Sequence, residues 1–256
     1  MSVERRWSAK LELAYHFDDK TNKTVLHHRR HQGPLRVQKS LYPEGEAVCH
    51  NFIVHPPAGI AGGDHLDIQV NLANDSHVVL STPGAGKWYK SAGLAASQHF
   101  TMCVSDKAKL EWLPQENIVF NGAEATQAFQ LDLAENACYI GWDITCLGRQ
   151  AQGEKLAQGR LQQRTQISRN GRPLWMEQAR IDGNDPLLSA QAGLANCPVY
   201  GTLMAVWDKH SVLSHTEQGK TLMAQLQAIT PKHMLGDSHH GVTRLPEVII
   251  ARFVGH

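Results

Sequence analysis

Apolar and polar positions alternate with a period of two along much of the chain. The pattern is clearest at 66–72, where Leu, Ile, Val and Leu alternate with Asp, Gln and Asn. It returns at 7–17, 100–104 and 129–133, and a more apolar run follows at 139–147. A period of two places alternate side chains on opposite faces of a strand, so these segments predict half-buried β-strands.

Polar turns separate these segments, and strands therefore recur at intervals of roughly ten residues, as in β-sandwiches, barrels or coils. Asn170-Gly171 lies between the extended segments 161–168 and 173–181. Asn-Gly is the strongest short-range hairpin signal, so these two segments are expected to pair. Strand–helix–strand alternation, which a parallel α/β sheet needs, does not occur. One helix is predicted at 216–229, with Thr216 as cap and Pro231 beyond its end, and a shorter one within 148–159.

The segment 55–64, His-Pro-Pro-Ala-Gly-Ile-Ala-Gly-Gly-Asp, joins two predicted strands. Its two prolines fix φ and remove backbone donors, whereas its three glycines permit positive φ and close backbone approach. The loop ends in the carboxylate of Asp64. Such a loop shapes backbone around another strand, a partner or an ion.

Composition narrows the classes of function. Hydrophobic residues make up 42% and charged residues 19% of the 256 residues, and the formal net charge is +1. These values are typical of a folded chain and give no reason to expect binding to nucleic acid or to a membrane. No apolar run is long enough to span a bilayer, and the first residues have no signal-peptide pattern. The five cysteines include no CxxC pair, which favours free thiols and a cytoplasmic location.

Signals for catalysis are weak. The segment 81–89, Ser-Thr-Pro-Gly-Ala-Gly-Lys-Trp-Tyr, contains the Gly-Lys pair of a phosphate-binding loop. However, Trp88 replaces the hydroxyl residue that would bind Mg²⁺, Ser81 replaces the first glycine, and Pro83 removes an amide. A structural turn is therefore favoured over nucleotide binding. The 15 histidines are scattered without zinc spacing, and Gly-x-Ser-x-Gly is absent.

Three carboxylates in apolar surroundings are more informative. Asp143 lies between Trp142 and Ile144, Glu177 follows Leu-Trp-Met, and Asp64 closes the glycine loop. A carboxylate in such a place is costly unless it is paired, hydrogen-bonded or facing water. One interpretation is a polar path or interface that contains all three. The alternative is that each caps a turn or pairs with an arginine, for which Arg149 and Arg180 are available.

Several segments together resemble the urease accessory protein UreD (UreH) family. They are Gly-Pro-Leu-Arg-Val-Gln at 33–38, Tyr-Pro at 42–43, the loop 55–64, the segment 82–91, Leu-Glu-Trp-Leu-Pro-Gln-Glu at 110–116, and Leu-Gly-Arg at 147–149. The similarity runs from Trp7 to about Arg252, so a single UreD-like domain over residues 1–256 is expected. The resemblance implies a mainly β, elongated, β-helix-like stack of short strands with about two α-helices.

The resemblance also implies a function. Members of this family are non-enzymatic chaperones that bind UreF, recruit UreG through UreF, and dock on the urease apoprotein for GTP-dependent nickel insertion. It implies no tightly bound cofactor, only transient Ni²⁺ on an internal path. Asp64, Asp143 and Glu177 match family positions that line that path.

Two alternatives stay open beside this interpretation. The first is an adaptor that only docks partner proteins, with carboxylates that cap turns. The second is a phosphate-loop hydrolase, against which the missing Mg²⁺ hydroxyl argues. Family members usually continue past the position of His256 with a helix and a Pro-Arg-Ile-Trp-like segment, so the chain is expected to be shortened.

Overall fold

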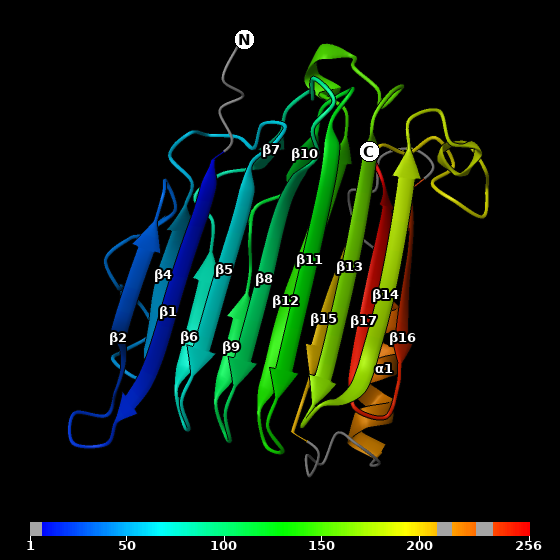
Figure 1. The fold of residues 1–256 in the computed structure, drawn as a ribbon. Helices are drawn as coiled ribbons and strands as arrows, with labels where there is room; N and C mark the ends of the chain where they lie inside the picture. The colour runs from blue at the N-terminus through cyan, green and yellow to red at the C-terminus, as the bar shows by residue number, and fades with distance from the viewer. Residues whose placement is uncertain (1–6, 209–216, 229–237) are drawn as a thin grey trace.

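Two β-sheets lie face to face in the computed structural model, which describes residues 7–208, 217–228 and 238–256 (Figure 1). The first sheet contains, in spatial order, β14 (Arg172–Asp182), β13 (Arg160–Arg169), β11 (Glu124–Leu133), β8 (Ala96–Val104), β5 (His65–Leu72), β1 (Ser8–Asp18) and β2 (Lys23–Gln32). The second contains β16 (His239–Arg244), β17 (Val248–Gly255), β15 (Val199–Val206), β12 (Cys138–Leu147), β9 (Lys109–Trp112), β6 (His77–Ser81), β4 (Val48–Val54) and β3 (Arg36–Val37). Two short strands, β7 (Gly86–Trp88) and β10 (Asn117–Val119), continue from β12, with β10 between β12 and β7.

The chain builds these sheets as successive coils. It passes from β5 in the first sheet to β6 in the second, back to β8, and then through β9, β11 and β12 to β13. Strands that follow one another within a sheet therefore come from successive coils and pair in parallel. This arrangement explains how parallel sheets form without connecting helices, and it confirms the predicted β-helix-like stack.

Short turns close the coils at one end of the stack. Asp75 and Lys107 adopt left-handed φ values of 61° and 57° in two successive turns. The turns are bonded to one another, because the Asp75 amide donates to the Asp106 carbonyl at 3.1 Å and the Asn136 amide donates to Asp106 Oδ1 at 3.1 Å. The register between coils is thus fixed at this end.

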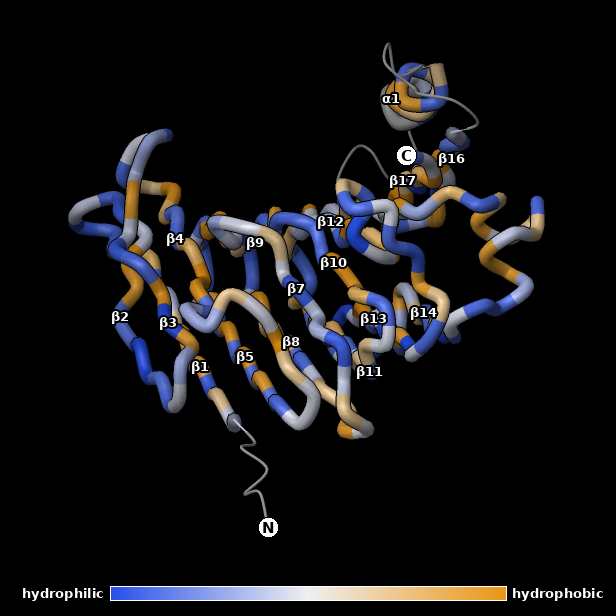
Figure 2. Tube along the Cα trace, turned by 90° about the horizontal axis from the view of Figure 1, so that it is seen from above, coloured by the Kyte–Doolittle hydropathy of each residue, from blue (hydrophilic) through white to orange (hydrophobic). Residues whose placement is uncertain are grey.

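The core lies between the two sheets. Figure 2, seen from above, shows hydrophobic and hydrophilic positions alternating along the strands. The predicted alternation at 66–72 is confirmed, since Leu66, Ile68, Val70 and Leu72 are all buried. Because each strand of a coil buries every second side chain against the opposite sheet, the inward positions of neighbouring coils stack into rows.

The predicted hairpin is also confirmed. β13 and β14 pair in antiparallel fashion, and Asn170 and Gly171 between them have φ values of 48° and 74°. Two consecutive residues with positive φ are the requirement of a tight two-residue hairpin. The hairpin makes β14 the last strand of the first sheet.

The C-terminal part replaces parallel coils by antiparallel strands, β15, β17 and β16, which the sequence pattern did not reveal. The predicted helix is confirmed as α1 (Glu217–Ala228), whereas Thr216 and Pro231 lie outside the described residues. Figure 2 shows α1 on the outer side of the second sheet, near β16 and β17. The second predicted helix is only a 3-10 turn, Gln150–Gln152, and a further 3-10 turn covers Pro186–Leu188. In the described segments, no helix is long and apolar enough to cross a membrane.

Candidate functional site

A cavity of about 320 Å³ lies between the sheets, at the end of the coils opposite the short turns. The loops that follow β4, β6 and β9 supply its outer lining, including His55, Pro83 and Gln115, together with Lys87 of β7. Its inner lining combines the aromatic rings of Phe100 and Trp112 with polar side chains from the strands, among them Gln98, Gln127 and Asp143. At this level the core therefore contains a space whose mainly apolar lining includes a few polar side chains.

Asp143 is the acidic group of this space. It sits in the middle of β12, on the inward face, and keeps some accessible surface because it faces the cavity. Its carboxylate accepts hydrogen bonds from Thr145 Oγ1 at 3.2 Å and from Gln163 Nε2 at 3.4 Å. Burial raises the pKa of Asp143 above its ordinary value, and hydrogen bonds from neutral side chains, Thr145 first among them, only partly oppose the rise.

Gln163 and Tyr200 lie beside Asp143 but are not part of the cavity lining. Gln163 Nε2 also donates to Gln127 Oε1 at 2.9 Å and to Thr145 Oγ1 at 3.2 Å, and the Tyr200 hydroxyl donates to Gln163 Oε1 at 2.5 Å. Burial raises the pKa of Tyr200, so its phenol is a donor rather than a phenolate at neutral pH, and the carboxylates of Asp143 and Glu177 act in the same direction. Tyr200 therefore lies within electrostatic reach of both acids.

Glu177 is on the last strand of the first sheet, facing the second sheet. Its Oε1 forms an ion pair with Arg252 Nη2 at 2.7 Å, and its Oε2 accepts from Trp175 Nε1 at 3.3 Å. The Arg252 guanidinium also lies over the Trp175 ring, 5.8 Å from its centroid. About half of the Arg252 side chain and a third of that of Glu177 are exposed, so this pair is at the edge of the stack and contacts solvent.

Asp64 has a more structural setting. It is buried, and its carboxylate accepts from the Ala61 amide at 2.9 Å and from the Trp7 amide at 3.3 Å. Burial lowers the pKa of the neighbouring His55, and the Asp64 carboxylate partly opposes the change. His55 lines the cavity and Asp64 does not, so Asp64 affects the cavity through its charge on this histidine.

The glycine loop that Asp64 closes is shaped around another strand. The Ile60 amide donates to the Lys87 carbonyl at 2.7 Å, and the Tyr89 amide donates to the Ile60 carbonyl at 2.9 Å. A Cβ at Gly59 would lie 2.3 Å from Cε2 of Tyr89, so only glycine fits there. Of the occupants that the sequence left open, the structure shows a neighbouring strand.

The three predicted carboxylates therefore do not form one cluster. Asp143 lines the cavity, Asp64 caps the loop 55–64, and Glu177 lies on the edge strand β14, where it pairs with Arg252. Among the residues the structure describes, no three His, Cys, Asp or Glu side chains gather in a way that could hold a metal ion. The alternative of capping or arginine pairing describes two of the three acids, since Asp64 caps its loop and Glu177 pairs with Arg252. The two arginines named as available have other partners, because Arg149 pairs with Glu154 and Arg180 with Asp182.

The Gly-Lys segment has a structural setting: residues 82–85 turn the chain after β6, and the Gly-Lys pair itself lies in a strand. Gly86, Lys87 and Trp88 form β7, so a strand stands where a phosphate-binding loop would begin a helix. Trp88 is fully buried and donates through Nε1 to Asn117 Oδ1 at 3.2 Å. Lys87 contributes only to the cavity lining.

Two sets of residues were missed by the sequence reasoning. The first is the glutamine row Gln98, Gln127 and Gln163, which pair side by side in β8, β11 and β13. The second is the buried Arg169, at the end of β13. Neither could be found from strand alternation, because the alternation shows which face a residue occupies and not which residues of other coils lie beside it.

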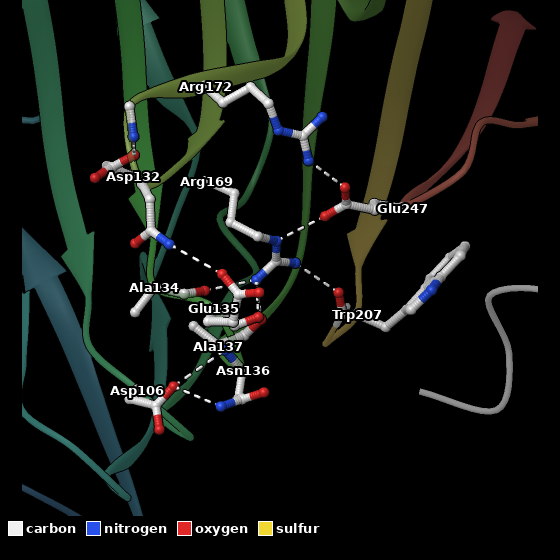
Figure 3. Close-up of polar contacts among 12 residues, drawn as sticks. Asp106, Asp132, Ala134, Glu135, Asn136, Ala137, Arg169, Arg172, Trp207 and Glu247 are labelled. Carbon is white, nitrogen blue, oxygen red and sulfur yellow. Dashed lines mark hydrogen bonds and ion pairs between the residues drawn. The ribbon is translucent and has the colours of Figure 1, made fainter. Parts of the chain in front are cut away.

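Arg169 is the centre of a polar cluster at the short-turn end (Figure 3). It forms an ion pair through Nε with Glu247 Oε2 at 2.7 Å, and Arg172 binds the other oxygen of the same carboxylate. Its two terminal nitrogens donate to the carbonyls of Ala134, Glu135, Ala137 and Trp207. Burial alone would raise the pKa of Glu247, but hydrogen bonds from Arg172 and Arg169 hold it below its ordinary value.

The described residues thus define a class: a β-helix-like protein with a cavity between its sheets and a single acid in the lining of that cavity. Comparison with known sequences gives the family. The family model described as UreD urease accessory protein matches residues 8–256. The chain is 48% identical to the urease accessory protein UreD of Dechloromonas aromatica over 250 residues, 98% of this chain and 83% of that protein. It is 42% identical to that of Methylobacillus flagellatus over 253 residues, 99% of this chain and 84% of that protein. It is 53% identical to that of Ralstonia nicotianae over 200 residues, 78% of this chain and 67% of that protein.

This chain belongs to the UreD family of urease accessory proteins.

Proposed function

We propose that this chain acts in urease maturation as a non-enzymatic scaffold through which Ni²⁺ reaches the urease apoprotein in the cytoplasm. In this proposal it binds UreF, and through UreF the GTPase UreG, which supplies the ion in a GTP-dependent step. Family membership supports the role in maturation. The observation that supports an internal route is Asp143, a carboxylate held in a cavity by neutral donors.

The chemistry of the cavity suits an ion in transit. Carboxylate and amide oxygens are hard ligands, and a single acid with neutral neighbours holds a divalent cation weakly. A tight site of three or more protein ligands would retain the ion and prevent its release. An unpaired buried carboxylate is costly to the fold, so a function that needs a negative charge inside the stack accounts for its presence.

The path we propose joins Asp64, Asp143 and Glu177. Asp64 acts at the cavity wall beside His55, Asp143 inside the cavity, and Glu177 at the edge of the stack beyond Tyr200. Arg252 forms an ion pair with Glu177. Half-exposed ion pairs contribute about 0–1 kcal/mol, so a divalent cation can displace this guanidinium.

A docking adaptor without a metal route is the second candidate, and two contacts favour it. Asp64 caps its own loop through the Ala61 amide, and Glu177 is paired with Arg252. Both contacts would be expected of structural carboxylates. Asp143 is the residue on which the two candidates differ.

The test is urease activation with the complete set of maturation proteins and limiting Ni²⁺. Asp143→Asn and Glu177→Gln keep side-chain shape and remove charge, and Asp67→Asn, on the outward face of β5, is the matched control. The metal route predicts that activation falls at least about tenfold in Asp143→Asn, since an ion loses the acidic side chain of the described cavity lining. Co-purification with UreF and apo-urease should stay unchanged. Normal activation by both path variants would leave only the adaptor.

A further inference from the structure

Inward-facing glutamines form a row across three successive coils. Gln98 in β8 pairs with Gln127 in β11, which pairs with Gln163 in β13. Gln98 and Gln127 line the cavity together with Asp143, whereas Gln163 is not part of its lining. The row therefore crosses the inner limit of the cavity, and Gln163 stands at that limit.

The Gln163 carboxamide is held on both sides. Its nitrogen donates to Gln127, Asp143 and Thr145, and its oxygen accepts from the Tyr200 hydroxyl at 2.5 Å. Tyr200 lies on β15, in the opposite sheet, and the carboxylates of Asp143 and Glu177 both add to the rise that burial causes in its pKa. The Gln163–Tyr200 hydrogen bond thus joins β13 to β15, the strands that lie between β12, which holds Asp143, and the strands β14 and β17, which hold Glu177 and Arg252.

We propose that Gln163, latched by Tyr200, is the gating residue between Asp143 and Glu177: its carboxamide must leave Tyr200 for a divalent cation to pass from one acid to the other. This inference rests on the proposed nickel route. It adds to that route a barrier, which two neutral side chains form when they are hydrogen-bonded to each other.

The chemistry of the pair suits this role. A carboxamide carries no charge, so it can change partners without leaving an unpaired ion, and its oxygen can replace a water molecule around the passing cation. A neutral hydrogen bond within a protein contributes only a small net free energy. The Tyr200–Gln163 hydrogen bond is therefore weak enough to break and specific enough to form again.

Two variants should change the rate of urease activation in opposite directions. Gln163→Leu puts an apolar side chain of similar size at the step and should lower the initial activation rate at least about tenfold, because a cation is poorly solvated there. Tyr200→Phe removes only the latch and should raise the rate about two- to tenfold, the range that one hydrogen bond gives. Gln162→Leu is the matched control, since Gln162 is the exposed neighbour of Gln163 on the outward face of β13.

Opposite changes are the decisive readout, because a merely structural loss would lower the rate in both variants. Wild-type rates in a folded Gln163→Leu protein would overturn the gate. Should Gln163→Leu not fold, Tyr200→Phe decides: a faster rate supports the gate and an unchanged or slower one overturns it. Asp143→Asn in the same assay distinguishes a failure of the gate from a failure of the nickel route. If it blocks activation while both gate variants behave as wild type, only the gate is wrong, and if it too is normal, the nickel route itself is wrong.

Discussion

Arg169 and Asp143 are both charged groups inside the same stack, but their surroundings differ. Arg169 is 2% exposed, has a carboxylate partner, and donates through its two terminal nitrogens to four backbone carbonyls. Asp143 faces a cavity and has only neutral donors. The first group is fully compensated, and the second is not.

The difference separates a structural role from a functional one. The Arg169 cluster joins the turn 134–137, the end of β13, the end of β15 and the β16–β17 turn, so it fixes how the antiparallel C-terminal strands meet the coils (Figure 3). Because Arg169 is buried and has these partners, a ligand has almost no surface of it to contact. The Asp143 carboxylate keeps a free side toward the cavity, where a cation can reach it.

Removing the Arg169 charge should have the largest effect on the fold. In Arg169→Met, Glu247 and four carbonyls lose a buried partner, and loss of one member of a buried pair costs about 3–5 kcal/mol. Urea unfolding measures this change. Arg172→Met is the control, since Arg172 binds the same carboxylate from an exposed position and should cost less than about 1 kcal/mol. Equal losses in the two variants would contradict the structural role assigned to Arg169.

Glu247→Gln should cost about 1–3 kcal/mol at neutral pH, because it removes a charge-assisted hydrogen bond to buried Arg169. The pKa of Glu247 is lowered in the fold, so the folded state binds fewer protons than the unfolded state. The stability that Glu247 contributes is therefore complete above its ordinary pKa of 4.5 and is lost as pH falls through the lowered value. Unfolding curves of the variant and wild type should converge in acid. A constant difference at all pH values would show that the charge is irrelevant.

Asp143→Asn should have the smallest effect on stability, with the opposite sign. Since the pKa of Asp143 is raised in the fold, the folded state binds more protons than the unfolded state as pH rises above the ordinary value of 3.8. The ionised carboxylate thus lowers stability at higher pH, and Asn removes that penalty. The variant should be as stable as wild type or up to about 1 kcal/mol more stable at neutral pH. A marked loss in thermal unfolding would place Asp143 with Arg169 as a structural group.

The sequence predicted the coils well and the site only in part. Alternation at 66–72 and the Asn170-Gly171 hairpin follow from local rules, and both are confirmed. Asp143 stood out because its neighbours are apolar. Gln163 and Arg169 did not, because an inward Gln in a polar strand and an Arg beside a turn have ordinary local surroundings. Their roles come from the register between coils and from strands near the C-terminus, which no local pattern encodes.

The most direct test of the account is Ni²⁺ binding to the purified chain, measured by titration calorimetry. The account predicts weak binding by wild type and by Asp67→Asn, and a clear loss of affinity in Asp143→Asn while its unfolding curve stays normal. Unaltered Ni²⁺ affinity in a folded Asp143→Asn protein would contradict it, because the charge in the cavity would then have no part in holding the ion.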